Sequence, residues 1–137
     1  MENGLFVLVA EDDLDDVEVL KMIFTQYFPD WHCHFVTNGQ NVIDFLKERY
    51  AQGKPVSFVL SDINMPVKDG ITTLAELRAT MEYKQLPFIG LSTTIFPPIL
   101  DRFMQLGGNA FFQKPESMDD YVQILKQISE KINQAQN

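Results

Sequence analysis

The chain has 137 residues and a mass of 15.8 kDa, the size of one ordinary domain. Hydrophobic residues make up 45% of it and charged residues 22%, which supplies enough apolar material for a core and excludes a disordered or collagen-like chain. A formal net charge of -8 repels phosphate backbones, so direct DNA binding is not expected.

The first half of the chain alternates short apolar runs with apolar residues at helical spacing. Residues 5–10 form a continuous apolar run, typical of a strand buried on both faces, and three acids follow it directly: Glu11, Asp12 and Asp13. A helix is predicted next, ending before Pro29, with its apolar face formed by Val17, Leu20, Phe24 and Tyr27. Residues 33–36 predict a second strand. A second helix is predicted to end at residues 53–55, with its apolar face formed by Val42, Phe45, Leu46 and Tyr50.

The second half repeats this alternation. Residues 56–61 predict a third buried strand, and Asp62 follows it. After a turn at residues 65–70, a third helix presents Ile71, Leu74, Leu77 and Met81. Residues 87–91 predict a fourth strand, and a shorter helix before Gly107 presents Ile99 or Leu100, Phe103 and Leu106. Residues 110–113 predict a fifth strand. The last helix is predicted to be capped by Ser117. Its apolar face is formed by Tyr121, Ile124 or Leu125, Ile128 and Ile132, and only residues 133–137 follow it.

Five strands that alternate with five helices through short connections predict an α/β fold, with a parallel sheet covered by helices on both faces. No linker interrupts the alternation, and the residues left after the last helix are too few for another domain. We therefore expect a single domain over residues 1–137. The acidic N-terminus, residues 1–4, lacks the basic start of a secretory signal, and no apolar run approaches the roughly 20 residues of a membrane span. A cytoplasmic protein without membrane contact is expected.

Polar residues follow four of the predicted strands. Parallel strands carry their carboxyl ends to one edge of the sheet, where ligands bind in open α/β folds. Carboxylates gathered there repel one another unless a divalent cation joins them, and Mg²⁺ prefers such oxygen ligands. His32 and His34 support a softer transition-metal site only weakly. The residues expected at this edge are Glu11, Asp12, Asp62, Ser92 and Lys114.

Some of these acids have a simpler interpretation. Carboxylates at a helix N-terminus cap it and interact with its dipole, and this is the preferred interpretation for Asp13, Asp15 and Asp16. It fits Glu11 and Asp12 less well, because both precede the helical spacing. Which of Glu11, Asp12 and Asp13 contacts a metal stays open.

Residues 60–70, which read L-S-D-I-N-M-P-V-K-D-G, fit the pattern L-x-D-x-x-M-P-x-x-D-G. With Glu11-Asp12, Ser92 and Lys114-Pro115 at matching places, the chain resembles the receiver domain of two-component response regulators. The resemblance runs from the first strand to the last helix and is strongest to stand-alone, chemotaxis-type regulators. It implies a flavodoxin-like fold with strand order 2-1-3-4-5.

The resemblance also implies a mechanism. Asp62 would accept a phosphoryl group from a histidine kinase or a histidine phosphotransfer protein and form an aspartyl phosphate. Mg²⁺ would be held by Glu11, Asp12, Asp62 and the main-chain carbonyl of Asn64. Lys114 and Ser92 would contact the phosphoryl group, and Phe111 would respond as the aromatic switch residue. Ser92 stands where threonine is more usual, and Phe111 where tyrosine is frequent.

The resemblance implies a signalling protein rather than an enzyme, with only intrinsic phosphorylation and dephosphorylation. Its output would be a protein target bound by the face of the fourth helix, fifth strand and fifth helix, where Phe96, Pro97 and Phe111 supply apolar surface. Two alternatives stay open. Residues 13–17 fit the D-x-D-x-[VT] signature of haloacid-dehalogenase-like phosphatases, although Asp13 does not directly end a strand. The other alternative is a pseudo-receiver that docks without being phosphorylated.

Overall fold

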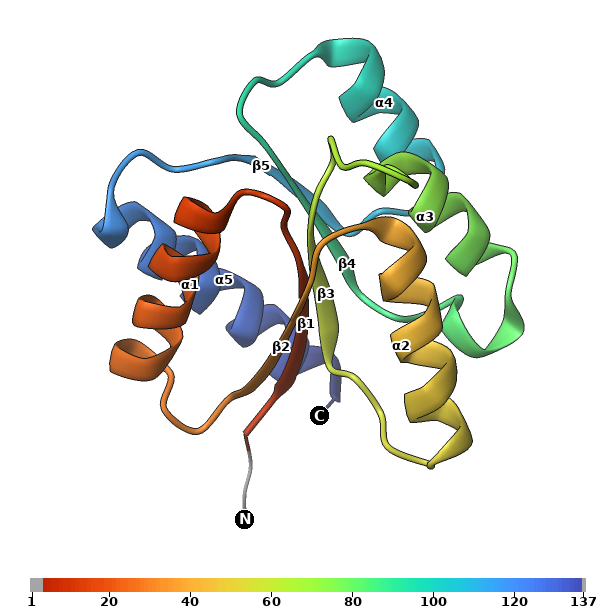
Figure 1. Cartoon of the computed structure of the whole chain (residues 1–137), viewed down its shortest axis with the longest axis horizontal. Helices are drawn as coiled ribbons and strands as arrows, with labels where there is room; N and C mark the ends of the chain where they lie inside the picture. The colour runs from red at the N-terminus through yellow and green to blue at the C-terminus, as the bar shows by residue number, and fades with distance from the viewer. Residues whose placement is uncertain (1–3, 137) are drawn as a thin grey trace.

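The computed structural model describes residues 4–136 and contains one five-stranded sheet (Figure 1). All strand pairs are parallel, and the order is β2-β1-β3-β4-β5. This confirms the predicted α/β fold and its strand order. The strands are β1 (Phe6–Ala10), β2 (His32–Val36), β3 (Phe58–Asp62), β4 (Phe88–Ser92) and β5 (Ala110–Gln113).

Helices cover both faces of the sheet. Figure 1 shows α1 and α5 on one side and α2, α3 and α4 on the other. Each connection between a strand and the next strand runs through a helix, as parallel neighbours require. The helices are α1 (Leu14–Tyr27), α2 (Gly39–Ala51), α3 (Gly70–Arg78), α4 (Pro97–Gln105) and α5 (Met118–Gln136), with a 3₁₀ turn, η1 (Met81–Tyr83), before β4.

The alternation of side chains along the strands divides the core into two layers. On β1, Val7 and Val9 pack toward α1 and α5, whereas Leu8 and Ala10 pack toward the other three helices. Every residue of β3 and β4 is buried, which explains why these strands read as continuous apolar runs rather than as alternating ones.

Short polar side chains fix where the helices begin, and they thereby position the loops at the carboxyl edge of the sheet. Asp13 caps α1 by accepting hydrogen bonds from the backbone N–H groups of Asp15 and Asp16. Asp69 caps α3 through Thr72 N–H, and Ser117 caps α5 through Asp120 N–H, as predicted for Ser117. The capping interpretation of Asp13 is thus confirmed.

Element ends differ from the sequence prediction in several places. The third strand spans Phe58–Asp62 rather than residues 56–61, so Asp62 is its last residue. Helix α3 ends at Arg78, and Met81 starts the separate 3₁₀ turn with 75% of its surface exposed. The apolar faces assigned to the first two helices were wrong at their last turns, where Tyr27 is 41% and Tyr50 61% exposed. Helix α5 continues to Gln136 instead of ending near residue 132.

Within residues 4–136, each helix is too short or too polar to serve as a membrane span. Residues 1–3, which carry most of the acidic N-terminus used in the prediction of location, lie outside the described residues, as does residue 137.

Candidate functional site

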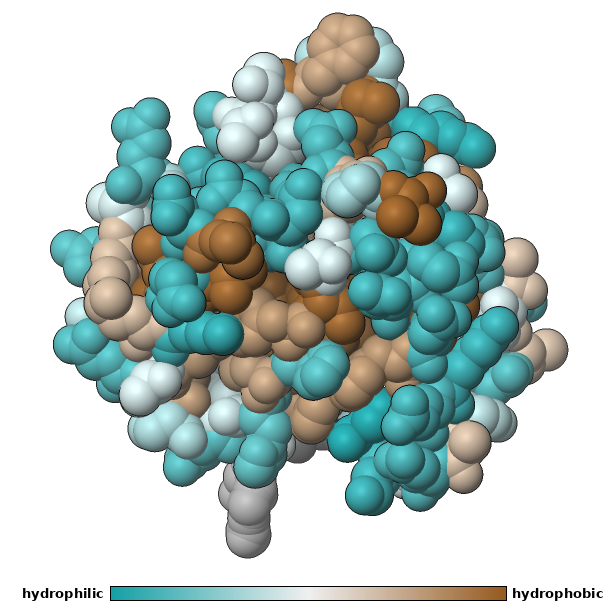
Figure 2. Space-filling model, in the orientation of Figure 1, coloured by the Kyte–Doolittle hydropathy of each residue, from teal (hydrophilic) through white to brown (hydrophobic). Residues whose placement is uncertain are grey.

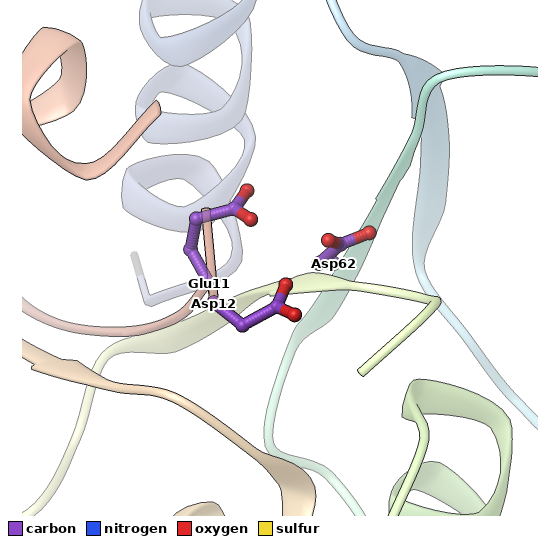
Figure 3. A group of neighbouring side chains, drawn as sticks. All are labelled: Glu11, Asp12 and Asp62. Carbon is purple, nitrogen blue, oxygen red and sulfur yellow. The ribbon is translucent and has the colours of Figure 1, made fainter. Parts of the chain in front are cut away.

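The carboxyl ends of β1 and β3 bring three acids together (Figure 3). Ala10 of β1 pairs with Ser61 of β3, so the residues that follow them, Glu11 and Asp62, lie next to each other at the ends of these two strands. One carboxylate oxygen from each of Glu11, Asp12 and Asp62 lies within 4.8 Å of the others. Glu11 and Asp62 are buried, with 1% and 6% of their surface exposed, whereas Asp12 faces solvent.

Lys114 follows β5 and places its ammonium among these acids. Its Nζ lies 2.8 Å from Glu11 Oε1, 2.9 Å from Asp16 Oδ2 and 3.3 Å from Asp62 Oδ2. The backbone of Lys114 is also fixed, because its N–H donates to the carbonyl of Ser92 at 2.7 Å. The acids and the ammonium expected at this edge of the sheet therefore lie close together.

Burial and charge act in opposite directions on these groups. Burial raises the pKa of Glu11 to about 7, although Lys114 and the N–H of Asp13 favour the carboxylate. Burial also opposes the charge on Lys114, but its contacts with Glu11 and Asp16 outweigh burial and raise the pKa of the ammonium. The lysine is thus held charged at neutral pH, and it offsets part of the repulsion among the acids.

One ammonium does not neutralise this group of acids. Glu11, Asp12 and Asp62 carry three carboxylates, and Glu11 Oε1 is buried without a hydrogen bond of good geometry although Lys114 is near. Three hard oxygen donors with unsatisfied charge fit a divalent cation. The two histidines are not part of this group: His34 stacks on Phe45 at 4.2 Å on the edge strand β2.

Two further hydrogen bonds lie in the loops next to Asp62, one of them to Asp62 itself. Asp62 Oδ1 accepts a hydrogen bond of 3.3 Å from the N–H of Asn64. Ser92 ends β4 beside β3, and its hydroxyl donates to the carbonyl of Thr94 at 2.8 Å. The Ser92 hydroxyl thereby binds its own loop and holds the start of the β4–α4 connection.

Phe111 is the second residue of β5 and lies next to Gly90 of β4 in the sheet. Its ring meets Phe103 of α4 edge to face, with centroids 5.2 Å apart. Gly90 on β4 leaves room for this contact, because a Cβ there would lie 3.1 Å from Phe111 and 3.0 Å from Phe103, which is tight. Phe111 is half-buried, and its contact with Phe103 joins β5 to α4.

The β3–α3 loop holds a residue in an unfavourable conformation. Val67 has φ 67° and lies in a three-residue turn closed by Lys68 N–H donating to Pro66 O at 2.7 Å. A β-branched residue with this φ is strained. The Val67 side chain is 82% exposed, so packing offsets little of that strain.

Replacing Val67 with glycine is expected to stabilise the protein by about 0.5–1 kcal/mol, because about 1–2 kcal/mol of strain is relieved and glycine's extra chain entropy cancels part of it. Urea unfolding measures the difference. The matched control is Gly53→Val, which puts the same side chain at φ 70° where a Cβ meets no atom within 4 Å. That variant should lose stability. A loss in Val67→Gly would mean that the loop conformation is not strained.

Asp16, predicted to interact with the helix dipole, also contacts Lys114, and this contact was not predicted. The two residues are far apart in the chain, and no local pattern links them. The stretch Asp13–Asp16 forms the cap and first turn of α1, so it does not place an aspartate at a strand end as the phosphatase signature requires.

Comparison with known proteins finds related chains with the same fold. Residues 7–126 match the family model of the response regulator receiver domain. The response regulator Rcp1 of Synechocystis is 23% identical over 124 residues, covering 89% of this chain and 84% of its own length. A solved structure of the Mn²⁺-bound form of a response regulator Rcp1 aligns with a TM-score of 0.78, 22% identity and 91% coverage of both chains.

Two further solved structures are similar. The phosphorylated cyanobacterial phytochrome response regulator RcpA aligns with a TM-score of 0.82 and 25% identity over 93% of both chains. The receiver domain of the sensor histidine kinase PA1611 from Pseudomonas aeruginosa, solved with a magnesium ion in its active site cleft, aligns with a TM-score of 0.72 and 22% identity over 91% of this chain and 97% of its own.

Proposed function

Because this chain belongs to the response regulator receiver domain family, whose members act in phosphorelay signalling, we propose that Asp62 is its phosphoacceptor and that phosphorylation switches a protein-binding face. The observation that carries the proposal is the position of Asp62. Its carboxylate is buried at the end of a central strand, lies 3.3 Å from an ammonium and shares a cluster with two other acids. A buried carboxylate beside an ammonium and other acids supports a role in phosphoryl transfer.

In the proposed reaction, a carboxylate oxygen of Asp62 attacks the phosphorus of a phosphohistidine. The P–O bond to Asp62 forms as the P–N bond breaks, and the histidine nitrogen keeps the electron pair and takes a proton. Lys114 would offset charge on the phosphoryl oxygens. The Ser92 hydroxyl would leave the Thr94 carbonyl and donate to another phosphoryl oxygen. The chain's own activity would be limited to this self-modification and its reversal.

Mg²⁺ is the cation proposed for the acidic cluster. Glu11, Asp12 and Asp62 offer carboxylate oxygens, and the main-chain carbonyl of Asn64 is a further proposed ligand. When bound, such an ion offsets negative charge on the nucleophile and on the transferring group. The hard donor set supports Mg²⁺, as do the receiver structures reported with magnesium and manganese.

The phosphoryl donor is proposed to be a sensor histidine kinase or a histidine phosphotransfer protein, the partners with which receiver domains interact. The receiving face for a downstream protein is proposed to be the one formed by α4, β5 and α5. Hydrophobic side chains are exposed at the start of α4, at the top of the molecule (Figure 2), where Ile95 is 40% and Phe96 59% exposed. Direct DNA binding is not proposed, because the chain's net charge is -8.

Acetyl phosphate with Mg²⁺ tests the proposed acceptor chemistry. Intact-mass spectrometry should show one added phosphoryl group, and removal of Mg²⁺ with a chelator should abolish it. A phosphate ester offered to the same protein should not be turned over repeatedly, whereas multiple turnovers would favour a phosphatase. If neither acetyl phosphate nor any histidine kinase modifies the protein, the result would favour a pseudo-receiver that docks without being phosphorylated.

Removing the Ser92 hydroxyl should uncouple the switch from the acceptor. In Ser92→Ala, Asp62 should still be phosphorylated, but no hydroxyl remains to draw the β4–α4 loop toward the phosphoryl group. Amide NMR with beryllofluoride, a phosphoryl mimic, should show shifts around Phe111 and α4 in the wild type and much smaller ones in the variant. Equal shifts in both proteins would show that Ser92 is not the coupling residue.

A further inference from the structure

Asp16 lies in the first turn of α1 and contacts the ammonium of Lys114 across the site. The Asp16 Oδ2 to Lys114 Nζ distance is 2.9 Å, shorter than the 3.3 Å between Lys114 and Asp62. Only 10% of the Lys114 side chain is exposed, compared with 34% for Asp16. Asp16 therefore contacts the Lys114 ammonium from the solvent side of the site.

The three partners of Lys114 are not equivalent. Glu11 and Asp62 belong to the group whose oxygens converge on the proposed cation position, and Asp16 does not. With a cation on that group, the oxygens of Glu11 and Asp62 would be shared with it, and its positive charge would repel the ammonium. Asp16 is then the one carboxylate among the three that stays wholly available to Lys114.

We propose that Asp16 is a positioning residue: it holds the Lys114 ammonium beside Asp62 when a divalent cation occupies the acidic cluster. The proposal rests on the proposed function, because it concerns the same lysine and acceptor. Without Asp16, the lysine would keep its partners in the metal-free protein and lose its anchor in the metal-loaded one. The effect of replacing Asp16 should thus depend on the metal.

The simpler role of an acid in this turn is to interact with the α1 dipole, and Asp15 provides the matched control. Asp15 is also in the first turn of α1 and carries the same charge, but it is exposed and is not among the three carboxylates that contact Lys114. Asp16→Asn and Asp15→Asn remove equal charge from the same helix end. Any difference between them reports on the contact with Lys114.

The test observes the Lys114 ammonium directly by ¹H–¹⁵N NMR, where only ammonium groups held in hydrogen bonds and shielded from exchange give a signal. The signal should be present in the wild type and in Asp15→Asn, with and without Mg²⁺. In Asp16→Asn it should be present without Mg²⁺ and disappear when Mg²⁺ is added. Asp16→Ala, as a second variant, should behave in the same way.

A kinetic measurement completes the test. With acetyl phosphate and Mg²⁺, Asp16→Asn should be phosphorylated about tenfold more slowly than Asp15→Asn, as expected when a charge-assisted contact to the lysine is lost. The inference is overturned if Asp16→Asn keeps its ammonium signal in Mg²⁺, loses it equally without Mg²⁺, or matches Asp15→Asn in rate. A wild type that is not phosphorylated would instead refute the proposed function, and the NMR comparison would still decide the role of Asp16.

Discussion

Replacing Asp62 with asparagine is expected to abolish phosphoryl uptake from acetyl phosphate and from a histidine kinase. The amide has the shape of the carboxylate but is not nucleophilic, so no aspartyl phosphate can form. Intact mass and peptide mapping check this result. The fold should persist, because asparagine fits the same buried position and can still accept the hydrogen bond from Asn64 N–H.

Asp69→Asn is the matched control for this experiment. Asp69 lies in the same loop and caps α3 through Thr72 N–H, a role that asparagine performs equally well. This variant should be phosphorylated like the wild type. A phosphoryl group that persists in Asp62→Asn, or that maps to another residue in the wild type, would contradict the assignment of the acceptor.

Removing the charge of Lys114 is expected to have the largest effect on stability. In Lys114→Ala without divalent cations, three carboxylates lose their shared ammonium, and the free energy of unfolding should fall by about 3 kcal/mol. This loss of unfolding free energy is at the lower end of the range for a broken buried ion pair, because Glu11, whose pKa is about 7, can take up a proton. Urea unfolding in the presence of a chelator measures it.

Millimolar Mg²⁺ should restore part of the stability of Lys114→Ala, because a cation on the acidic cluster replaces the missing positive charge. Lys47→Ala, on the exposed surface of α2, serves as a control and should change stability by less than about 0.5 kcal/mol. Failure of Mg²⁺ to stabilise Lys114→Ala more than the wild type would argue against a cation site formed by these acids.

Much of the site follows from the sequence because it lies at strand ends. Buried strands appear as continuous apolar runs, and the residue types that follow them are read directly. Once the strands are parallel, Glu11, Asp62 and Lys114 share one edge of the sheet, whatever the details of packing. The positions of these residues were therefore predictable, as was the Asp13 cap, which depends only on neighbouring residues.

The errors concern residues whose environment is set by distant parts of the chain. Tyr27 and Tyr50 have helical spacing but stay exposed, although Phe24 and Leu46, one turn earlier on the same faces, are buried. Helix α3 ends at Arg78, and the guanidinium of this residue donates to the carbonyls of Tyr83 and Gly107 outside the helix. No periodicity within residues 71–81 contains that information.

The sequence by itself determined the alternation of strands and helices, the parallel sheet and the set of polar residues at its carboxyl edge, because these depend on local patterns and on chain connectivity. Only the tertiary structure decided which of the acids contact Lys114, that Asp16 is among them, and that Ser92 binds the Thr94 carbonyl. These contacts depend on where helices and loops pack against the sheet to within an ångström. Side chains from distant segments set that packing, and sequence spacing does not record it.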